Sequence, residues 1–189
     1  GYVNSDMSKF KGKAIAQAIG TDYFTLLELV PKRGVDLEIQ DTVYIGKGKR
    51  DQIYKVLGKL DYENLTATSR IELEYSIREI VNNNEEKFVD FFNTAGAIST
   101  RLHKLELIPG IGKKYMWEIV EARKEKPFES FEDITTRIPS LNNPAEMIVN
   151  RVKQELDTTT AKKGKKKYYL FTPIPKTQKK HRNNRNQRK

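Results

Sequence analysis

The sequence predicts an α+β protein in which a small β-barrel is followed by an all-helical region and a disordered basic tail. Three observations predict this order. Short runs rich in aromatic and apolar residues, separated by glycine and proline turns, occupy the first 62 residues. An apolar period near 3.6 residues replaces them from Leu65 onward. After Asp157 the chain carries 12 basic residues and no acidic ones, whereas the part up to Asp157 carries 23 basic and 25 acidic residues, so the net charge of +10 belongs to the tail.

The predicted barrel is built from short strands at Ala14–Ile19, Asp22–Val30 and Asp41–Ile45. Residues Gln52–Leu60 follow as a fourth strand or as a short helix. The Pro31–Gly34 turn separates the second strand from the third. Several short strands joined in this way predict a small closed sheet such as an OB-like barrel, which the periodicity alone does not distinguish from an SH3-like barrel.

An acidic helical connector follows the barrel. Apolar residues from Ile71 to Val81 predict an amphipathic helix that ends at Asn82–Asn84, and Glu85–Asn93 predicts a second short helix. Residues 62–90 hold seven acidic and three basic residues, a balance that repels phosphate. We expect a structural connector, or alternatively a docking face for a basic protein partner.

Four further helices are expected. The first is Thr100–Leu107, capped by Ser99, and the second runs from Gly112 to about Lys124. Ser130 caps the third, with acidic residues in the first turn. The fourth is Pro144–Leu156, because proline suits the first turn of a helix.

The most informative segment is the turn between the first two of these helices, where an apolar helix end meets a Pro-Gly-Ile-Gly hairpin. Its two glycines reach backbone angles closed to other residues and permit close approach of a ligand. The second glycine opens a helix, whose free N–H groups attract an anion. This order resembles the helix-hairpin-helix motif, which binds the sugar-phosphate backbone without reading base sequence. The candidate contact residues are Pro109, Gly110, Ile111, Gly112, Lys113 and Lys114.

A second hairpin with the same spacing is predicted at Ile138–Asn143. Ser140 and Asn142 stand where the first hairpin has glycines, and asparagine tolerates the left-handed region better than most residues. We treat both residues as candidate contacts, with a purely structural role for this hairpin as the alternative.

Basic residues outside the hairpins supply two more candidate contacts. Lys47, Lys49 and Arg50 form a basic turn that either tracks a backbone or is a solvated loop, and the spacing of a phosphate-binding P-loop is absent. In the tail, Arg182 and Arg185 suit phosphate contact and stacking, with a solubilising end as the alternative.

The composition argues against an enzyme. The chain has no cysteine and two histidines, which leaves almost no material for thiolate zinc sites, histidine clusters or Ser-His triads. Asp133 is explained as a first-turn acid after Ser130, and the Asp36–Glu38 pair lacks the lysine of a nuclease site. We expect no catalytic residues, no cofactor and no metal. The absence of cysteine and of any apolar run near the roughly 18 residues of a membrane helix predicts a cytoplasmic protein without membrane contact.

Taken together, residues 14–171 resemble a domain-of-unknown-function family of archaeal proteins with an OB-like domain and a tandem helix-hairpin-helix domain. The matching stretches are Ala16–Gly20, Tyr23–Pro31, Val43–Gly48, Arg101–Trp117, Lys126–Ile134 and Lys167–Phe171. The resemblance implies the OB assignment, and together with the residue pattern it predicts four regions: an OB-like domain at 1–62, an acidic connector at 63–98, the tandem domain at 99–157 and the basic tail at 173–189. The apolar run at 167–172, between two basic stretches, is expected to return as a strand on the OB-like domain.

The hairpin, the basic tail and the lack of catalytic residues predict a non-catalytic nucleic-acid-binding protein. The resemblance adds RNA as the preferred ligand over DNA, a link to translation or RNA processing, and ribosomal or RNA-processing proteins as further partners. The alternative is a protein-interaction module in a larger nucleoprotein complex. The oligomeric state is left open.

Overall fold

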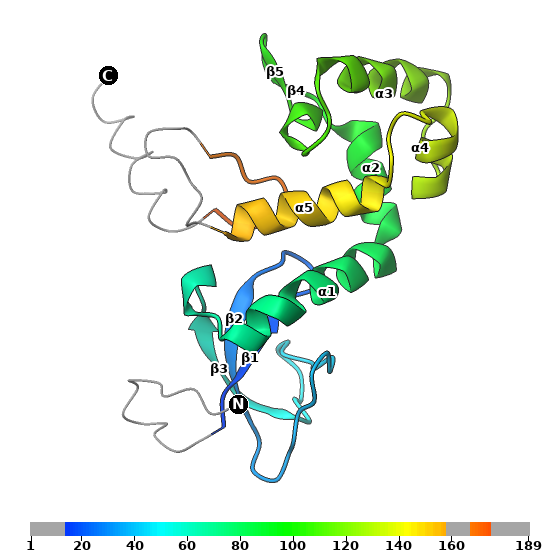
Figure 1. The fold of residues 1–189 in the computed structure, drawn as a ribbon. Helices are drawn as coiled ribbons and strands as arrows, with labels where there is room; N and C mark the ends of the chain where they lie inside the picture. Colours follow the sequence, from blue (N-terminus) through cyan, green and yellow to red (C-terminus); the bar gives the residue numbers. More distant parts are fainter. Residues whose placement is uncertain (1–13, 158–166, 175–189) are drawn as a thin grey trace, which may run out of the picture.

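The computed structural model describes residues 14–157 and 167–174. The described elements are β1 (Ala16–Ile19), β2 (Leu26–Pro31), β3 (Ile53–Lys59), η2 (Tyr62–Asn64), α1 (Ala67–Asn83), α2 (Glu85–Thr94), β4 (Ala97–Ser99), β5 (Leu102–His103), η3 (Leu105–Leu107), α3 (Lys113–Glu125), α4 (Phe131–Arg137) and α5 (Pro144–Leu156). Figure 1 shows the sheet and α1 at one end, α3 and α4 at the other, and α5 between them. None of the helices in the described part is both long and apolar enough to cross a membrane.

β1, β2 and β3 form one antiparallel sheet in that order. The second strand begins at Leu26 rather than at Asp22, because a tight turn precedes it. In this turn the Phe24 N–H donates to the Gly20 carbonyl oxygen over 2.9 Å, and Phe24 adopts a left-handed φ of 50°. The Phe24 ring is thereby fully buried and joins the core beneath the helices.

The predicted barrel is not closed. In the described part of the chain its sheet has three strands, and the strand predicted at Asp41–Ile45 is absent. Residues 32–52 form one long connection instead, closed at its base where the Lys32 N–H donates to the Gln52 carbonyl oxygen over 2.8 Å. Local contacts explain the difference: the Asp41 carboxylate accepts from the Glu38 N–H over 2.8 Å, so this backbone folds on itself rather than pairing in a ladder.

The two helices of the acidic connector are confirmed as α1 and α2. The Thr66 hydroxyl accepts from the Ser69 N–H over 3.1 Å and so caps α1. Leu73, Ile77 and Val81 bury one face of α1 in the core, as the apolar period predicts.

The helix predicted at Thr100–Leu107 is wrong. β4 and β5 form a hairpin here, and a single 3-10 turn, η3, follows. Ser99 provides the physical reason, because its hydroxyl accepts from the Arg101 N–H over 3.3 Å and stabilises a turn instead of capping a helix. The Lys104 N–H also donates to the Gly96 carbonyl oxygen over 3.1 Å, which fixes the base of the hairpin.

The remaining helices are confirmed as α3, α4 and α5. The Ser130 hydroxyl accepts from the Asp133 N–H over 3.0 Å and caps α4 as predicted. Asn93 on α2 binds the segment between α3 and α4 with both ends of its amide, donating to the Phe128 carbonyl oxygen and accepting from the Phe128 N–H. These bonds hold the helices around one apolar cluster that also includes Phe24 and Leu26 from the sheet region.

The strand predicted at 167–172 is also absent; this segment lies against α5 instead. The Glu155 carboxylate of α5 is 2% exposed. It accepts from the N–H groups of Leu170, Phe171 and Thr172 over 2.7–3.0 Å and from the Thr172 hydroxyl. A carboxylate thus receives the backbone donors that a neighbouring strand would have received. Of the tail predicted at 173–189, only residues 173 and 174 are described.

Arg151 completes this buried arrangement. Its Nε donates to Glu155 over 2.8 Å, and its two terminal nitrogens donate to the carbonyl oxygens of Leu107 and Tyr168. The pair therefore joins three segments: α5, the end of η3 and the C-terminal segment.

We predict that Glu155→Gln lowers the free energy of unfolding by about 3–5 kcal/mol, the usual cost of removing one partner of a buried ion pair. The amide replaces an oxygen acceptor with a donor that faces N–H groups. Urea unfolding followed by circular dichroism measures the effect, with the exposed neighbour Gln154→Ala as the control. A loss below about 1 kcal/mol would show that the C-terminal segment does not depend on this carboxylate.

Candidate nucleic-acid interface

The first predicted hairpin lies between η3 and α3, and two isoleucines hold it in place. Ile108 and Ile111 are 1% and 3% exposed, and the Ile111 N–H donates to the Ile108 carbonyl oxygen over 3.0 Å. Gly110 between them has a φ of 89°, which a residue with a side chain rarely adopts. Ile111 is thus an internal anchor rather than a ligand contact, and the glycines and lysines around it face outward.

Side chains of α5 contact this hairpin and fix its position. Arg151 donates to the Leu107 carbonyl oxygen over 3.0 Å, immediately before the hairpin. A Cβ placed on Gly110 would lie 3.4 Å from the terminal methyl of Met147 on α5. The hairpin therefore rests on a helix that the Arg151–Glu155 pair fixes.

The start of α3 is open to solvent. Gly112 occupies the N-cap position with no side chain to cap the helix, and the first helical hydrogen bond runs from the Met116 N–H to the Gly112 carbonyl oxygen. The N–H groups of Lys113, Lys114 and Tyr115 consequently have no partner within the helix. Gly112 and both lysines are exposed, and no atom lies within 4 Å of a Cβ built on Gly112.

The other described α-helices do not share this arrangement. α1, α4 and α5 begin with a capping side chain, and α2 has two glutamates in its first turn. α3 has neither a capping side chain nor an acidic residue there. Among the described α-helices, α3 is therefore the one whose N-terminus has neither a side-chain cap nor a negative charge in the first turn.

The second hairpin shares one internal hydrogen bond with the first, but the helix that follows it begins with a side-chain cap. The Leu141 N–H donates to the Ile138 carbonyl oxygen over 2.9 Å, and both side chains are buried as in the first hairpin. Asn143, rather than Asn142, adopts the left-handed conformation, with a φ of 53°. The Asn143 side chain accepts from the Glu146 N–H over 3.0 Å, so it occupies the amides at the start of α5.

Ser140 of the second hairpin and Lys114 of the first hairpin both contact the carboxylate of Glu118. The Ser140 hydroxyl donates to this carboxylate over 3.1 Å, and the Lys114 ammonium lies 3.8 Å from the same carboxylate. The structure thus brings Ser140 close to the candidate residues of the first hairpin, while Asn142 is an exposed residue of the second.

The basic turn of the sheet region does not extend this surface. Lys47, Lys49 and Arg50 lie in the long 32–52 connection, at the opposite end of the molecule from α3 (Figure 1). Arg50 is half-buried and donates to the Gly46 carbonyl oxygen over 3.0 Å, which gives it a structural role in that loop. Arg182 and Arg185 lie outside the described residues.

Sequence reasoning missed one residue of this surface, Trp117. It lies on α3 one helical turn after Lys113 and is 58% exposed. The signal was present, because Met116 and Ile119 define the buried stripe of α3 and Trp117 falls outside it.

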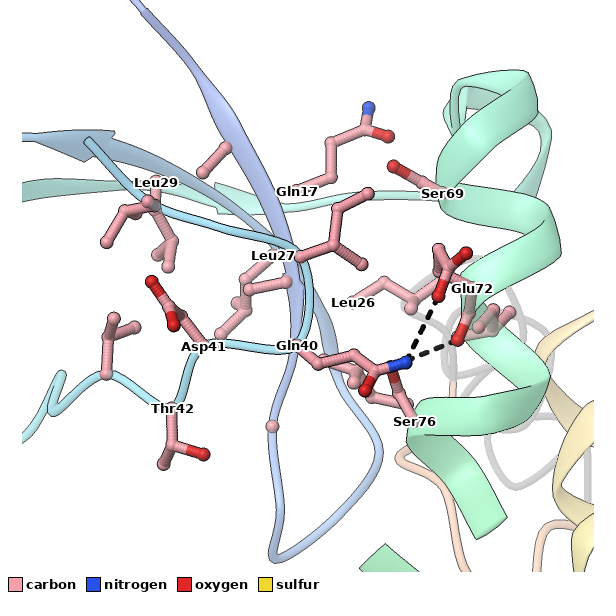
Figure 2. Close-up of a pocket in the computed structure, with 18 of the residues that line it drawn as sticks. Gln17, Leu26, Leu27, Leu29, Gln40, Asp41, Thr42, Ser69, Glu72 and Ser76 are labelled. Carbon is pink, nitrogen blue, oxygen red and sulfur yellow. Dashed lines mark hydrogen bonds between the residues drawn. The ribbon is translucent and has the colours of Figure 1, made fainter. Parts of the chain in front are cut away.

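A groove of about 780 Å³ lies between the sheet, residues 37–45 and α1 (Figure 2). Gln40 reaches across it and donates to the Glu72 carboxylate on α1 over 3.2 Å. Apolar residues of β1 and β2 form its floor, and no lysine or arginine contributes to its lining. The described residues hold no cluster of three or more metal-ligating side chains, in this groove or elsewhere. The carboxylates among the lining residues are those of Asp22, Glu38, Asp41, Glu72 and Glu79.

His103, five residues before Ile108, is a half-buried histidine whose ring takes part in a backbone hydrogen bond. Its Nδ1 accepts from the Leu105 N–H over 3.2 Å, which requires the unprotonated nitrogen. Burial lowers the pKa of His103 below its ordinary value of 6.5, and the charge of Arg123 lowers it further. The unfolded chain therefore binds this proton more tightly than the folded one.

We predict from this shift that the contribution of His103 to the free energy of unfolding is constant above pH 6.5 and falls as the pH drops below 6.5 toward the pKa of folded His103. Urea unfolding at about pH 7.5 and about pH 5 measures the change, and His103→Asn makes it smaller. If the variant and the parent chain lose the same stability over this interval, His103 is not the titrating group.

Comparison with known proteins places the chain in a family. Residues 1–173 match the model of a protein family described as "Protein of unknown function (DUF655)". The uncharacterized protein MJ0038 of Methanocaldococcus jannaschii is 48% identical over 157 residues, which are 83% of this chain and 70% of that protein. The crystal structure of Af1531 from Archaeoglobus fulgidus superposes with a TM-score of 0.79 at 43% identity, covering 92% of this chain and 93% of that one. The chain therefore belongs to the DUF655 family, whose members include proteins of these two archaea.

Proposed function

We propose that the protein binds nucleic acid without catalysis and that the first hairpin, residues 109–114, holds a backbone phosphate in the manner of a helix-hairpin-helix. The observation that carries the proposal is the uncapped, exposed start of α3 between two glycines and two lysines. Three amides without a helical partner and the exposed side chains of Lys113 and Lys114 lie at this helix start, and together they can supply the donors that a phosphate oxygen requires.

The two lysines at the start of α3 lower the stability of that helix. Lys113 and Lys114 occupy the first turn of α3, where the positive end of the helix dipole disfavours cations. Glu118 offsets only Lys114, while Lys113 has no ion-pair partner among the described residues. A bound phosphate supplies the negative charge that the protein omits at this position, so the sequence favours ligand binding over the stability of the free helix.

The ligand is recognised through its backbone. Amide and ammonium donors contact phosphate oxygens, which every nucleotide carries, so binding by the hairpin is independent of base sequence. On the basis of the family resemblance, we propose RNA as the preferred ligand and translation or RNA processing as the setting. We also propose that the sheet region adds a second nucleic-acid-binding surface, as OB-like domains do. The basic residues after Asp157 add unspecific attraction to polyanions.

Gly112→Asp tests this proposal with one change. Gly112 has an ordinary φ of −85° and open space at its Cβ, and aspartate is a favoured N-cap, so we predict that the variant is at least as stable as the parent chain. Its carboxylate takes the free amides and repels phosphate, so affinity for single- and double-stranded RNA and DNA falls at least about tenfold. Fluorescence anisotropy at several salt concentrations measures this loss.

Asn142→Asp is the matched control. It places the same charge at the position that corresponds to Gly112 in the hairpin spacing, one residue before the Asn143 N-cap, whose side chain already accepts from the Glu146 N–H. We expect its affinity to stay within about twofold of the parent chain, since no phosphate contact is lost. Equal losses in both variants would indicate general repulsion, and unchanged affinity in Gly112→Asp would exclude the first hairpin as the site.

The acidic groove supports a second candidate function, a protein-interaction module in a larger nucleoprotein complex. It combines an apolar floor with five carboxylates and no basic residue, which complements an extended segment rich in lysine and arginine. Basic extensions of ribosomal or RNA-processing proteins have this chemistry.

The prediction from the groove is that protein partners copurify after nuclease treatment and are lost when Asp41 and Glu72 are both replaced by lysine. Glu63→Lys, an exposed carboxylate outside the groove lining, is the control for charge alone. Quantitative mass spectrometry of the copurified proteins compares the three chains. Disappearance of every partner on nuclease treatment would leave nucleic acid as the sole link.

A further inference from the structure

We propose that Trp117 stacks on an unpaired base and that the ligand of the first hairpin is single-stranded nucleic acid. This inference rests on the proposed function and adds the substrate class. It starts from an exposed ring: the Trp117 side chain is 58% exposed, lies outside the apolar cluster and makes no ring contact with another described residue. Leaving a side chain of this size in water forgoes the stabilisation that its burial gives.

Helix geometry places this ring beside the candidate phosphate site. Trp117 follows Lys113 by four residues, so both side chains lie on one face of α3, with their Cα atoms about 6 Å apart along the axis. Side chains of a helix tilt toward its N-terminus and cover the preceding turn. The surface that the indole covers therefore lies toward Lys113 and the uncapped amides.

The combination of ring and phosphate site selects an unpaired strand. In a duplex the base faces are stacked on one another, and a side chain on the outside reaches only phosphates and base edges. A single strand exposes base faces beside its own phosphates, and base–aromatic stacking accepts every base because each has a π face. This tolerance agrees with a hairpin that contacts only the backbone.

The other exposed aromatic side chains do not offer the same combination. Arg78 lies over the Tyr75 ring on α1, Lys87 lies over the Tyr23 ring, and the Tyr44 hydroxyl accepts from the Gly48 N–H within its own loop. Tyr54, which is also exposed, lies on β3. None of these four tyrosines follows an uncapped helix start. Tyr75, 54% exposed and remote in the sequence, is therefore a matched control for the loss of an exposed ring.

The experiment uses the full chain, in which Trp117 is the one tryptophan. Labelled oligouridylate and oligothymidylate of about 12 nucleotides are compared by anisotropy with RNA and DNA duplexes of the same length. Single strands are expected to quench the Trp117 fluorescence, whereas duplexes leave it unchanged. We expect Trp117→Ala to weaken single-strand binding by about 5- to 150-fold, the loss of one base–aromatic stack, and to change duplex binding by less than about twofold.

Two further variants separate stacking from folding. Trp117→Phe keeps an aromatic face and is expected to retain most of the single-strand affinity, and Tyr75→Ala is expected to bind as the parent chain does. Thermal unfolding of Trp117→Ala should match that of the parent chain, because the ring is exposed.

The outcomes distinguish this inference from the function on which it rests. Unchanged single-strand binding by Trp117→Ala, or an equal loss for single strands and duplexes, overturns the stacking role. If Gly112→Asp still abolishes binding in that case, the hairpin remains the site and only the inference about Trp117 fails. If neither variant changes binding, both the inference and the proposed function fail.

Discussion

The buried ion pair of α5 is the interaction on which the rest of the C-terminal half depends. Burying a carboxylate is favourable only when its oxygen atoms are fully satisfied. Glu155 meets that condition, because the Arg151 guanidinium, three backbone N–H groups and one hydroxyl donate to it. The two terminal nitrogens of Arg151 also donate to the carbonyl oxygens of Leu107 and Tyr168. One pair of side chains, a single helical turn apart, thus fixes the chain before the first hairpin and the segment at 167–172.

This arrangement explains how a short hairpin without a preceding α-helix is held rigid. η3 is a single 3-10 turn, which has poorer hydrogen-bond geometry than an α-helix. The bond from Arg151 to the Leu107 carbonyl and the buried isoleucines on both sides of Gly110 compensate for its brevity. The amides of α3 are consequently presented by a fixed backbone, which lowers the ordering cost of binding.

The two hairpins share an internal hydrogen bond and a pair of buried apolar residues, but the helix starts that follow them differ in chemistry. In the second hairpin Asn143 caps α5, and Glu146 in the first turn pairs with Arg78 of α1 over 3.1 Å. In the first, Gly112 stands at the N-cap and Lys113 and Lys114 are the first two residues of the helix. We interpret this difference to mean that the second hairpin has a structural role, whereas the first is the proposed binding site.

Local signals predicted the helices well because caps and apolar periods act within one element. α5 begins at Pro144 and ends at Leu156 as predicted, and Ser130 caps α4. The same reasoning failed at Ser99, since a serine hydroxyl stabilises turns as well as helix starts. It also failed for the segment at 167–172, whose backbone donors are received by a glutamate on another element.

The candidate site was partly predictable because part of it lies within one short stretch of the sequence. Residues 109–114 are contiguous, so their sequence already contains the hairpin. Trp117 could have been recognised from its position outside the buried stripe of α3. The acidic groove could not, because residues 37–45 and α1 meet only in the folded chain.

The central claim is that the free amides at the start of α3 receive a phosphate. Amide chemical shifts of the ¹⁵N-labelled full chain, followed during titration with a single-stranded oligonucleotide, test it most directly. The account predicts the largest changes at Lys113, Lys114 and Tyr115, with little change at Ala145 and Glu146 at the start of α5. Changes confined to the second hairpin or to the sheet, with the α3 amides unmoved, would contradict it.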